Sequence, residues 1–158
     1  MVDEKEIRAL CLDLLETGWP AYVTTVDAKG YPQTRAMFNL RNRDRFPKLI
    51  PFFDKHREDF TVMFTTNTSS TKITELKARP PISVYYCNPD KWRGVMFGGD
   101  IEVVDDSDEM KEFWHDDWTK YYPKGYDDPD HTMLRLVPAV AKGWAGSMTF
   151  RLELGDKQ

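Results

Sequence analysis

The polar and apolar positions near the N-terminus repeat with the period of an α-helix. Between residues 4 and 17 apolar side chains recur three and four positions apart, which predicts an amphipathic helix with one buried face. Asp3 and Glu6 have the spacing of a capping box at its start, and Gly18 and Pro20 end it. The predicted buried face comprises Ile7, Leu10, Cys11, Leu14 and Leu15.

Most of the remaining chain has the β-prone composition of strands. Residues 21–27 and 32–40 flank a short turn that contains Gly30, a pattern typical of a β-hairpin. The same criteria indicate β-type segments at 49–53, 61–66, 82–87, 94–105, 133–138, 139–146 and 148–154.

Two helices interrupt these strands. Residues 69–78 predict a short helix with Ile73 and Leu76 inward, and residues 108–118 predict another, capped by Asp106 or Ser107. Residues 116–130 resemble a long irregular loop. Since strands outnumber helices and short turns join several of them, we expect a mainly β protein, an antiparallel barrel with flanking helices. We expect a single domain over 1–158, with an N-terminal helix at 1–18 and a barrel with inserted helices over 19–154.

Composition narrows the class of protein. The chain is 41% hydrophobic and 13% aromatic, which indicates a folded core. A net charge of −4 argues against a general nucleic-acid binder. No apolar run approaches the roughly 18 residues of a membrane span, and the N-terminus does not resemble a signal peptide. Two cysteines, Cys11 and Cys87, are too few for a disulfide framework, so we expect a cytoplasmic protein.

Residues 64–80 carry the most informative polar pattern. A strand leads to Thr65 and Thr66, and a helix follows whose first turn holds Ser70, Thr71 and Lys72. The free amides of a helix N-terminus favour an anion, whereas the helix dipole disfavours a lysine there. A bound phosphate would resolve that conflict. Alternatively, the hydroxyls only cap the helix and the lysine is solvated.

Arg35 is a second candidate for phosphate binding. It lies in a predicted strand, where a charged side chain is unusual unless that face is wet or meets a ligand. Its guanidinium is suited to a bidentate grip on phosphate. The alternative is an outward-facing residue paired with an acid.

In their order and spacing, these residues resemble the FMN-binding split barrel of the pyridoxamine 5′-phosphate oxidase family, and most closely its short general-stress-protein branch. The resemblance covers about residues 20–146. It rests on Arg35-Ala36-Met37, Phe64-x-Thr66-Asn67-x-x-Ser70-x-Lys72, Leu76, Pro80, Gly99-Asp100-Ile101-Glu102, Asp105, Asp106, Leu134-Arg135-Leu136-x-Pro138 and Trp144.

The resemblance implies a six-stranded antiparallel split barrel that forms a homodimer with FMN in two clefts at the interface. Arg35 and the Ser70-Thr71-Lys72 turn would hold the phosphate. Thr65 and Thr66 would lie against the ribityl chain or the ring edge, and Trp144 would approach the flavin from the partner subunit. The backbone along the isoalloxazine would be that of Ala36, Met37, Phe38 and Asn39.

Three positions depart from the oxidases. Thr71 stands where they have an arginine, and Gly94 corresponds to a glutamine that contacts the flavin. Their Arg-x-His substrate motif is matched by Arg151-Leu152-Glu153, so Arg151 is a candidate substrate residue, but a carboxylate replaces the imidazole. Because that carboxylate would repel a phosphorylated substrate, we do not expect vitamin B6 oxidase activity.

Several functions stay open. The first is an FMN-dependent oxidoreductase that acts on a small molecule with a donor such as NAD(P)H; the second is a non-catalytic flavin-binding stress protein; the third is the same barrel with F420 or haem. The three histidines lack zinc-site spacing, so no metal is expected. The aromatic residues between 114 and 126 could form a lid over a planar substrate, although dimer packing is the simpler interpretation.

Overall fold

The computed structural model describes residues 2–155, and its first element confirms the predicted N-terminal helix. Helix α1 spans Glu4–Thr17, and Cys11, Leu14 and Leu15 are buried on its inner face. The predicted capping box is wrong, because Asp3 is the N-cap but its side chain accepts no capping hydrogen bond. Its backbone carbonyl instead accepts from the amides of Glu6 and Ile7.

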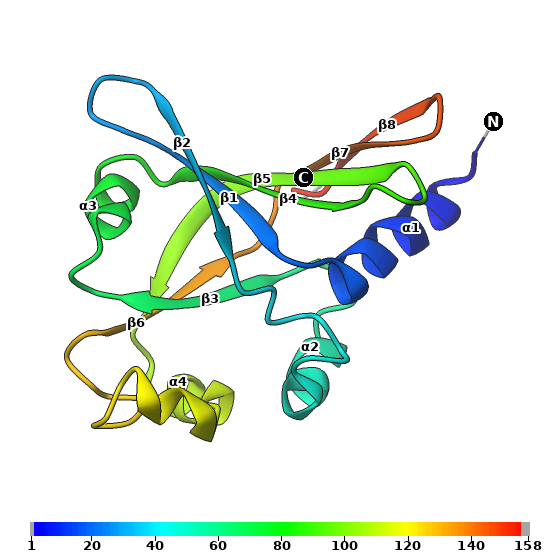
Figure 1. The fold of residues 1–158 in the computed structure, drawn as a ribbon. Coiled ribbons are helices and arrows are strands. Elements are labelled where there is room, and N and C mark those ends of the chain that lie inside the picture. Colours follow the sequence, from blue (N-terminus) through cyan, green and yellow to red (C-terminus); the bar gives the residue numbers. More distant parts are fainter. Residues whose placement is uncertain (1, 156–158) are drawn as a thin grey trace.

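Antiparallel pairing joins the described strands into one curled sheet that forms a half-barrel with flanking helices (Figure 1). Six strands follow the order β2-β1-β4-β5-β6-β3, and the β7–β8 hairpin pairs with β5. This confirms the mainly β antiparallel class and adds the hairpin to the six expected strands. The strands are β1 Ala21–Val26, β2 Pro32–Met37, β3 Val62–Asn67, β4 Pro81–Asn88, β5 Arg93–Val104, β6 His131–Leu136, β7 Val140–Ala145 and β8 Met148–Glu153.

Strand β5 changes partners at a pair of glycines, and this change curls the sheet. Its first half pairs with β7 and its second half with β6. A Cβ at Gly99 would lie 3.2 Å from the backbone nitrogen of Ala139, and one at Gly98 would lie 3.2 Å from Val140 Cγ1. These glycines therefore let β5 pass close to the segment that contains Ala139 and Val140.

Gly143 on β7 occupies a tighter position and supports a stability prediction. A Cβ there would lie 2.3 Å from the carbonyl oxygen of Gly94 and 2.6 Å from the Phe150 ring. We expect Gly143→Ala to reduce the free energy of unfolding by about 3 kcal/mol through overpacking, measured by urea denaturation. Gly155→Ala is the matched control, because within residues 2–155 no atom beyond its chain neighbour lies within 4 Å of its added Cβ. Equal midpoints for the two variants would contradict this packing.

Two hydrophobic clusters lie on opposite faces of β3 and β6. One fills the half-barrel beneath α1 and α3 (Thr71–Ala78), and the other lies under α2 (Ile50–Asp54) and α4 (Ser107–Phe113). Val62 and Phe64 point into the first cluster, whereas Met63 between them points into the second. Figure 1 shows α2 and α4 on the same side of these strands.

The β-type segment expected at 49–53 is wrong. The chain forms a 3-10 turn at Pro47–Leu49 and then α2. Pro47 and Pro51 each lie in the first turn of their helix, where a backbone N–H would have no intrahelical acceptor, so its absence costs no hydrogen bond. Phe52 and Phe53 are buried against Phe113 of α4, so a contact with a remote segment stabilises this helix.

The helix expected at 108–118 is shorter. Asp106 caps α4 by accepting from the Glu109 amide at 2.8 Å, which confirms one of the two candidate caps. The helix ends at Phe113, because Trp114 takes an extended backbone conformation. A 3-10 helix, η2, then covers Asp116–Lys120, at the start of the region expected to be an irregular loop.

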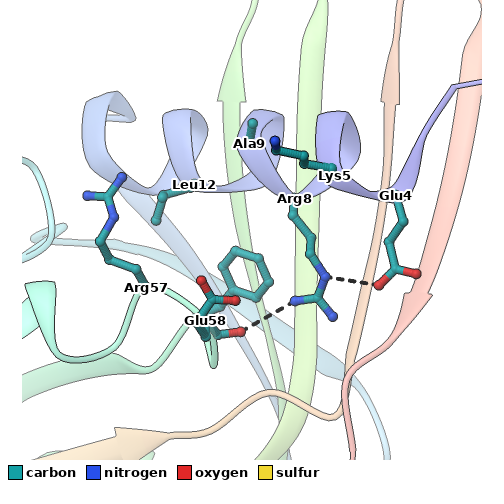
Figure 2. Close-up of a pocket in the computed structure, with 8 residues that line it drawn as sticks. Glu4, Lys5, Arg8, Ala9, Leu12, Arg57 and Glu58 are labelled. Carbon is teal, nitrogen blue, oxygen red and sulfur yellow. Dashed lines mark hydrogen bonds and ion pairs between the residues drawn. The ribbon is translucent and has the colours of Figure 1, made fainter.

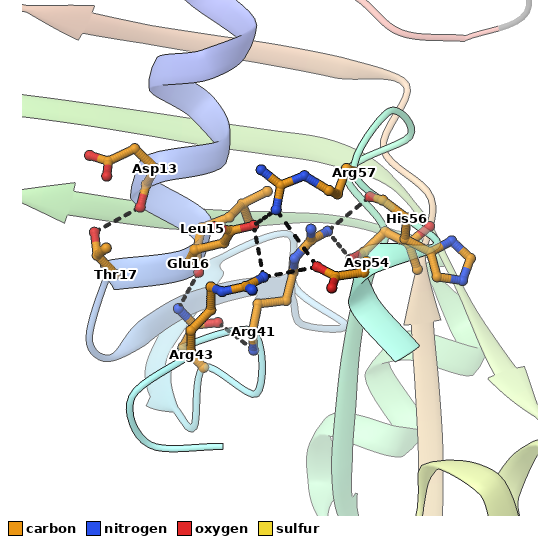
Figure 3. Close-up of polar contacts among 11 residues, drawn as sticks. Asp13, Leu15, Glu16, Thr17, Arg41, Arg43, Asp54, His56 and Arg57 are labelled. Carbon is orange, nitrogen blue, oxygen red and sulfur yellow. Dashed lines mark hydrogen bonds and ion pairs between the residues drawn. The ribbon is translucent and has the colours of Figure 1, made fainter. Parts of the chain in front are cut away.

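Three arginine side chains link helix α1, helix α2 and the segment that follows α2. Arg43 reaches Asp54 at 2.9 Å, and Arg57 reaches Glu16 of α1 at 2.7 Å (Figure 3). Arg41 is buried and donates to the carbonyls of His56 and Thr61.

Among residues 2–155, no helix has both the length and the apolar character needed to cross a membrane.

Candidate functional site

Lys72 lies at the start of α3 beside the end of β3, where two hydroxyl groups accept hydrogen bonds from it. Its Nζ donates to Thr66 Oγ1 at 2.6 Å and to Ser70 Oγ at 2.8 Å. Ser70 is the N-cap of α3, but its side chain makes no capping hydrogen bond. Burial, and then the positive charge of Arg35, lower the pKa of Lys72. The lysine is half-buried and directed to these hydroxyls, unlike the solvated lysine of the simpler interpretation.

Arg35 reaches the same region from β2 through a short polar chain. Its Nη1 donates to Thr25 Oγ1 at 2.6 Å, and that hydroxyl donates to Glu75 Oε2 at 2.5 Å. The guanidinium also pairs with Glu75 at 3.4 Å. Arg35 is therefore paired with an acid, as the alternative interpretation held, and that acid lies on α3, the helix that begins beside Lys72.

We call Arg35, Lys72, Thr66 and Ser70 the cation cluster. It holds two positive charges, of which Arg35 is paired with the Glu75 carboxylate. The first amides of α3 add partial positive charge beside Lys72. Lys72 and these amides therefore favour an anion at the start of α3.

The other predicted phosphate and flavin contacts differ in their placement. Ala36 and Phe38 are exposed, Met37 is half-buried at the end of β2, and Thr71 is exposed at the start of α3. Asn39 is 1% exposed, and its side-chain nitrogen donates to two carbonyls at the end of α1. At this position only the backbone could meet a cofactor.

A groove leads away from the cation cluster. Thr65, Thr66 and Asn67 of β3 line one part, and Phe38 with aromatic residues of the 114–122 segment lines the rest, around a volume of about 210 Å³. Its lining residues Phe38, Trp118 and Tyr121 also line a second hollow of about 400 Å³. We call this second volume the aromatic hollow; its other lining residues are Trp19, Arg45, Phe46, His115, Asp117 and Lys120.

The aromatic segment packs largely within the chain. Trp118 and Tyr122 are almost fully buried, and Trp114 packs against both. Neither the lid nor the dimer interpretation accounts for these core contacts. Tyr121 is 51% exposed and borders both hollows, so it is the ring of this segment most open to a ligand.

Trp144 and Arg151 belong to another part of the sheet. Trp144 lies on β7 and packs against Trp92, and its ring borders the same space at Gly94 as the Tyr85 hydroxyl. A Cβ at Gly94 would lie 2.2 Å from that hydroxyl, so the tyrosine fills the space of the side chain that the resemblance expects there. Arg151 is exposed and pairs with Glu153 at 2.6 Å. The approach of Trp144 to a flavin from a partner subunit stays a prediction.

Sequence reasoning missed three polar residues around the cluster: Thr25, Glu75 and Asp130. Glu75 lies four positions after Thr71 on the exposed side of a predicted helix, and nothing local marks it as a partner of Arg35. Asp130 binds the turn before α3 from 61 residues away in the sequence. Only the tertiary structure brings these residues to the site.

A hollow of about 480 Å³ lies elsewhere, between α1 and residues 57–60 (Figure 2). Arg8 borders it, pairs with Glu4 at 2.9 Å and donates to the Glu58 carbonyl at 3.4 Å. Arg57, also on its border, pairs with Glu16. Because both arginines are paired with carboxylates and Glu4 and Glu58 also line this hollow, it is a weaker candidate for an anion than the cation cluster.

The fold and site together define an antiparallel half-barrel with paired cations where β3 meets α3. The chain belongs to the family described as pyridoxamine 5′-phosphate oxidase like, which matches residues 33–154. None of the curated proteins compared with the chain matches it.

Solved structures support the same fold. A protein from Clostridium acetobutylicum, related to general stress protein 26 of Bacillus subtilis and placed in the pyridoxinephosphate oxidase family, is 27% identical. The match covers 97% of each chain with a TM-score of 0.76. General stress protein 26 from Bacillus anthracis is 17% identical, with 93% of this chain and 99% of that one covered and a TM-score of 0.67.

Two further matches carry other cofactor names. A haem-binding protein from Mycobacterium smegmatis is 13% identical, with 97% of this chain and 60% of that one covered and a TM-score of 0.64. A protein described as an F420 reductase is 21% identical, with 82% and 93% covered and a TM-score of 0.52. At these identities the likeness concerns the fold alone.

Proposed function

We propose that this protein binds FMN and acts as an oxidoreductase on a small molecule. One observation carries the proposal: Lys72 at the start of α3 lies among the hydroxyls of Thr66 and Ser70 and feels the charge of Arg35, which pairs with Glu75 further along the same helix. A phosphate group supplies the negative charge that this cluster favours.

The lining of the neighbouring groove has the chemistry that suits the polar chain and the ring system of FMN. It begins at Thr66, which is already a member of the cluster, and continues between Thr65 and the Phe38 and Tyr121 rings. A phosphate held at Lys72 would direct a polar chain along the β3 hydroxyls and a planar ring system toward aromatic side chains. When bound, FMN would supply hydride or electron transfer, and the protein would supply orientation and electrostatics.

The substrate would enter the aromatic hollow. Its rings suit a planar molecule, and Arg45 and Lys120 give its rim two cations, with Asp117 beside them. The Arg45 guanidinium lies 3.9 Å from the centre of the Trp19 ring, so a stacked platform is already formed. We include a donor such as NAD(P)H in the proposal.

We further propose that the protein forms a homodimer and is located in the cytoplasm. A homodimer would bring Trp144, and with it Arg151, toward the flavin of the other subunit. Trp92, packed on Trp144, is 63% exposed, and a large exposed aromatic side chain there is compatible with an interface. The thiols Cys11 and Cys87 are free, as expected in the cytoplasm.

The absorption spectrum of the purified protein tests the cofactor directly. We expect the two visible bands of an oxidised flavin, either as isolated or after FMN is added, and a released chromophore with the mass of FMN. A protein that shows no flavin bands after excess FMN is added and the unbound FMN is removed would contradict the proposal. A Soret band would favour haem as the cofactor, and a chromophore with the mass of F420 would favour F420.

Turnover is tested separately from binding. The FMN-loaded protein is mixed with NADH or NADPH, and bleaching of the flavin bands under anaerobic conditions is followed. We expect bleaching, and then reoxidation by a small-molecule acceptor. Stable flavin bands with both donors would favour the non-catalytic flavin-binding protein.

A further inference from the structure

Asp130, in the loop before β6, holds the turn that precedes α3. Its Oδ1 accepts from the Ser69 amide at 3.0 Å, and its Oδ2 accepts from the Asn67 side chain at 2.6 Å. Its backbone carbonyl accepts from the Thr68 amide at 2.8 Å. One residue therefore binds three consecutive residues of this turn. We call residues 67–70 the anion turn.

The anion turn ends at Ser70, whose hydroxyl accepts a hydrogen bond from Lys72. A second link holds the same turn to β6, because the hydroxyls of Thr68 and Thr132 lie 2.6 Å apart. Hydrogen bonds from the turn lower the pKa of Asp130, that from Asn67 most, so the residue is a carboxylate at neutral pH. Its acceptors are engaged by the turn, and no cation contacts it among residues 2–155.

Simple electrostatics gives this carboxylate an unfavourable role. A negative charge beside a phosphate site repels the phosphate, so its removal should strengthen binding. The hydrogen bonds predict the opposite effect. Without them the Ser69 amide and the Asn67 side chain lose their acceptor, and the Ser70 hydroxyl is no longer held in place for Lys72 and an anion.

We propose that Asp130 is a positioning residue that orders the anion turn for the phosphate of the cofactor. This inference rests on the proposed FMN site. Asp130 itself touches neither the cofactor nor the reacting atoms. It acts through Ser69 and Ser70, and the gain in order of the turn exceeds the repulsion by its charge.

The test compares FMN with riboflavin, which lacks the phosphate, in fluorescence titrations of the full chain. We expect Asp130→Ala, which removes both acceptor oxygens, to weaken FMN binding by about tenfold or more and to leave the riboflavin affinity within about twofold. Asp127→Ala is the matched control. It removes the same charge from the same exposed loop, and this side chain makes no hydrogen bond or ion pair among residues 2–155. We expect both affinities of the control to be unchanged.

Each other outcome overturns the inference. Tighter FMN binding by Asp130→Ala would show that repulsion dominates, and an equal loss for both ligands would show a general structural role. Unchanged FMN binding would show no role. If this variant does not fold, Asn67→Ala removes one contact of the carboxylate, and the same selective loss of FMN is required. Failure of the wild-type chain to bind FMN would overturn the proposed function and this inference together, whereas a wild type that binds FMN isolates the role of Asp130.

Discussion

Replacement of Arg35 and Lys72 together by alanine is expected to abolish FMN binding. Each cation would form charge-assisted hydrogen bonds with the phosphate, worth about 1.5–3 kcal/mol apiece. Their joint loss of about 3–6 kcal/mol corresponds to roughly two to four powers of ten in the dissociation constant. Fluorescence titration of FMN with the purified variant measures this change.

The controls separate the site from general charge and from folding. Lys91→Ala with Lys111→Ala removes two positive charges at exposed positions outside the cluster and the groove, and we expect FMN binding to be retained. Among the residues that the structure describes, removal of Arg35 leaves the Glu75 carboxylate with the Thr25 hydroxyl alone, so the urea midpoint of the double variant is measured as well. Tight FMN binding by a folded double variant would contradict the assignment of this cluster.

The fold could be predicted wherever local pattern and tertiary packing agree. Helix α1 and the β1–β2 hairpin follow directly from apolar spacing and from the turn at Gly30. The segment around Phe52 and Phe53 could not be predicted, because a run of large apolar side chains is compatible with a strand or with a buried helix. Its helix is stabilised by Phe113, which follows 60 residues later in the sequence.

The site could be predicted only in part, for a similar reason. Lys72 and Ser70 are close in sequence, and the conflict between the lysine and the helix dipole marks this turn. Arg35 is a phosphate candidate because it is a charged residue in a predicted strand, and its contact with Glu75 on α3 places it beside the same helix. The role of Asp130 could not be predicted from the residues around it, because the groups that donate to its carboxylate, on Asn67 and Ser69, lie 63 and 61 residues away in the sequence.

Asn39 shows how a residue beside the site can matter for the fold. Its side-chain nitrogen donates to the carbonyls of Leu15 and Gly18, both at 2.8 Å, and its Oδ1 accepts from the Arg41 amide at 3.1 Å. These bonds satisfy two carbonyls at the end of α1 that the helix itself leaves free. The end of β2 and the start of the groove are thereby anchored to α1.

Asn39→Asp is therefore expected to cost about 4 kcal/mol of unfolding free energy at pH 7. The change keeps the size of the side chain but replaces its donor by a buried carboxylate that faces two carbonyl oxygens. Asn88→Asp is the matched control, because Asn88 uses its oxygen to accept from the Lys91 amide, and aspartate retains that acceptor. Urea denaturation of both variants and the wild type measures the difference.

The pH dependence of this loss identifies its cause. Burial raises the pKa of the introduced carboxyl above its value in the unfolded chain, so between these two values the folded state binds more protons. The stability of Asn39→Asp relative to wild type should then fall as pH rises through this window and recover as pH is lowered from 7 toward 5. A relative loss that is the same at both pH values would indicate altered packing instead of a buried charge, and would contradict the hydrogen-bonding role assigned to Asn39.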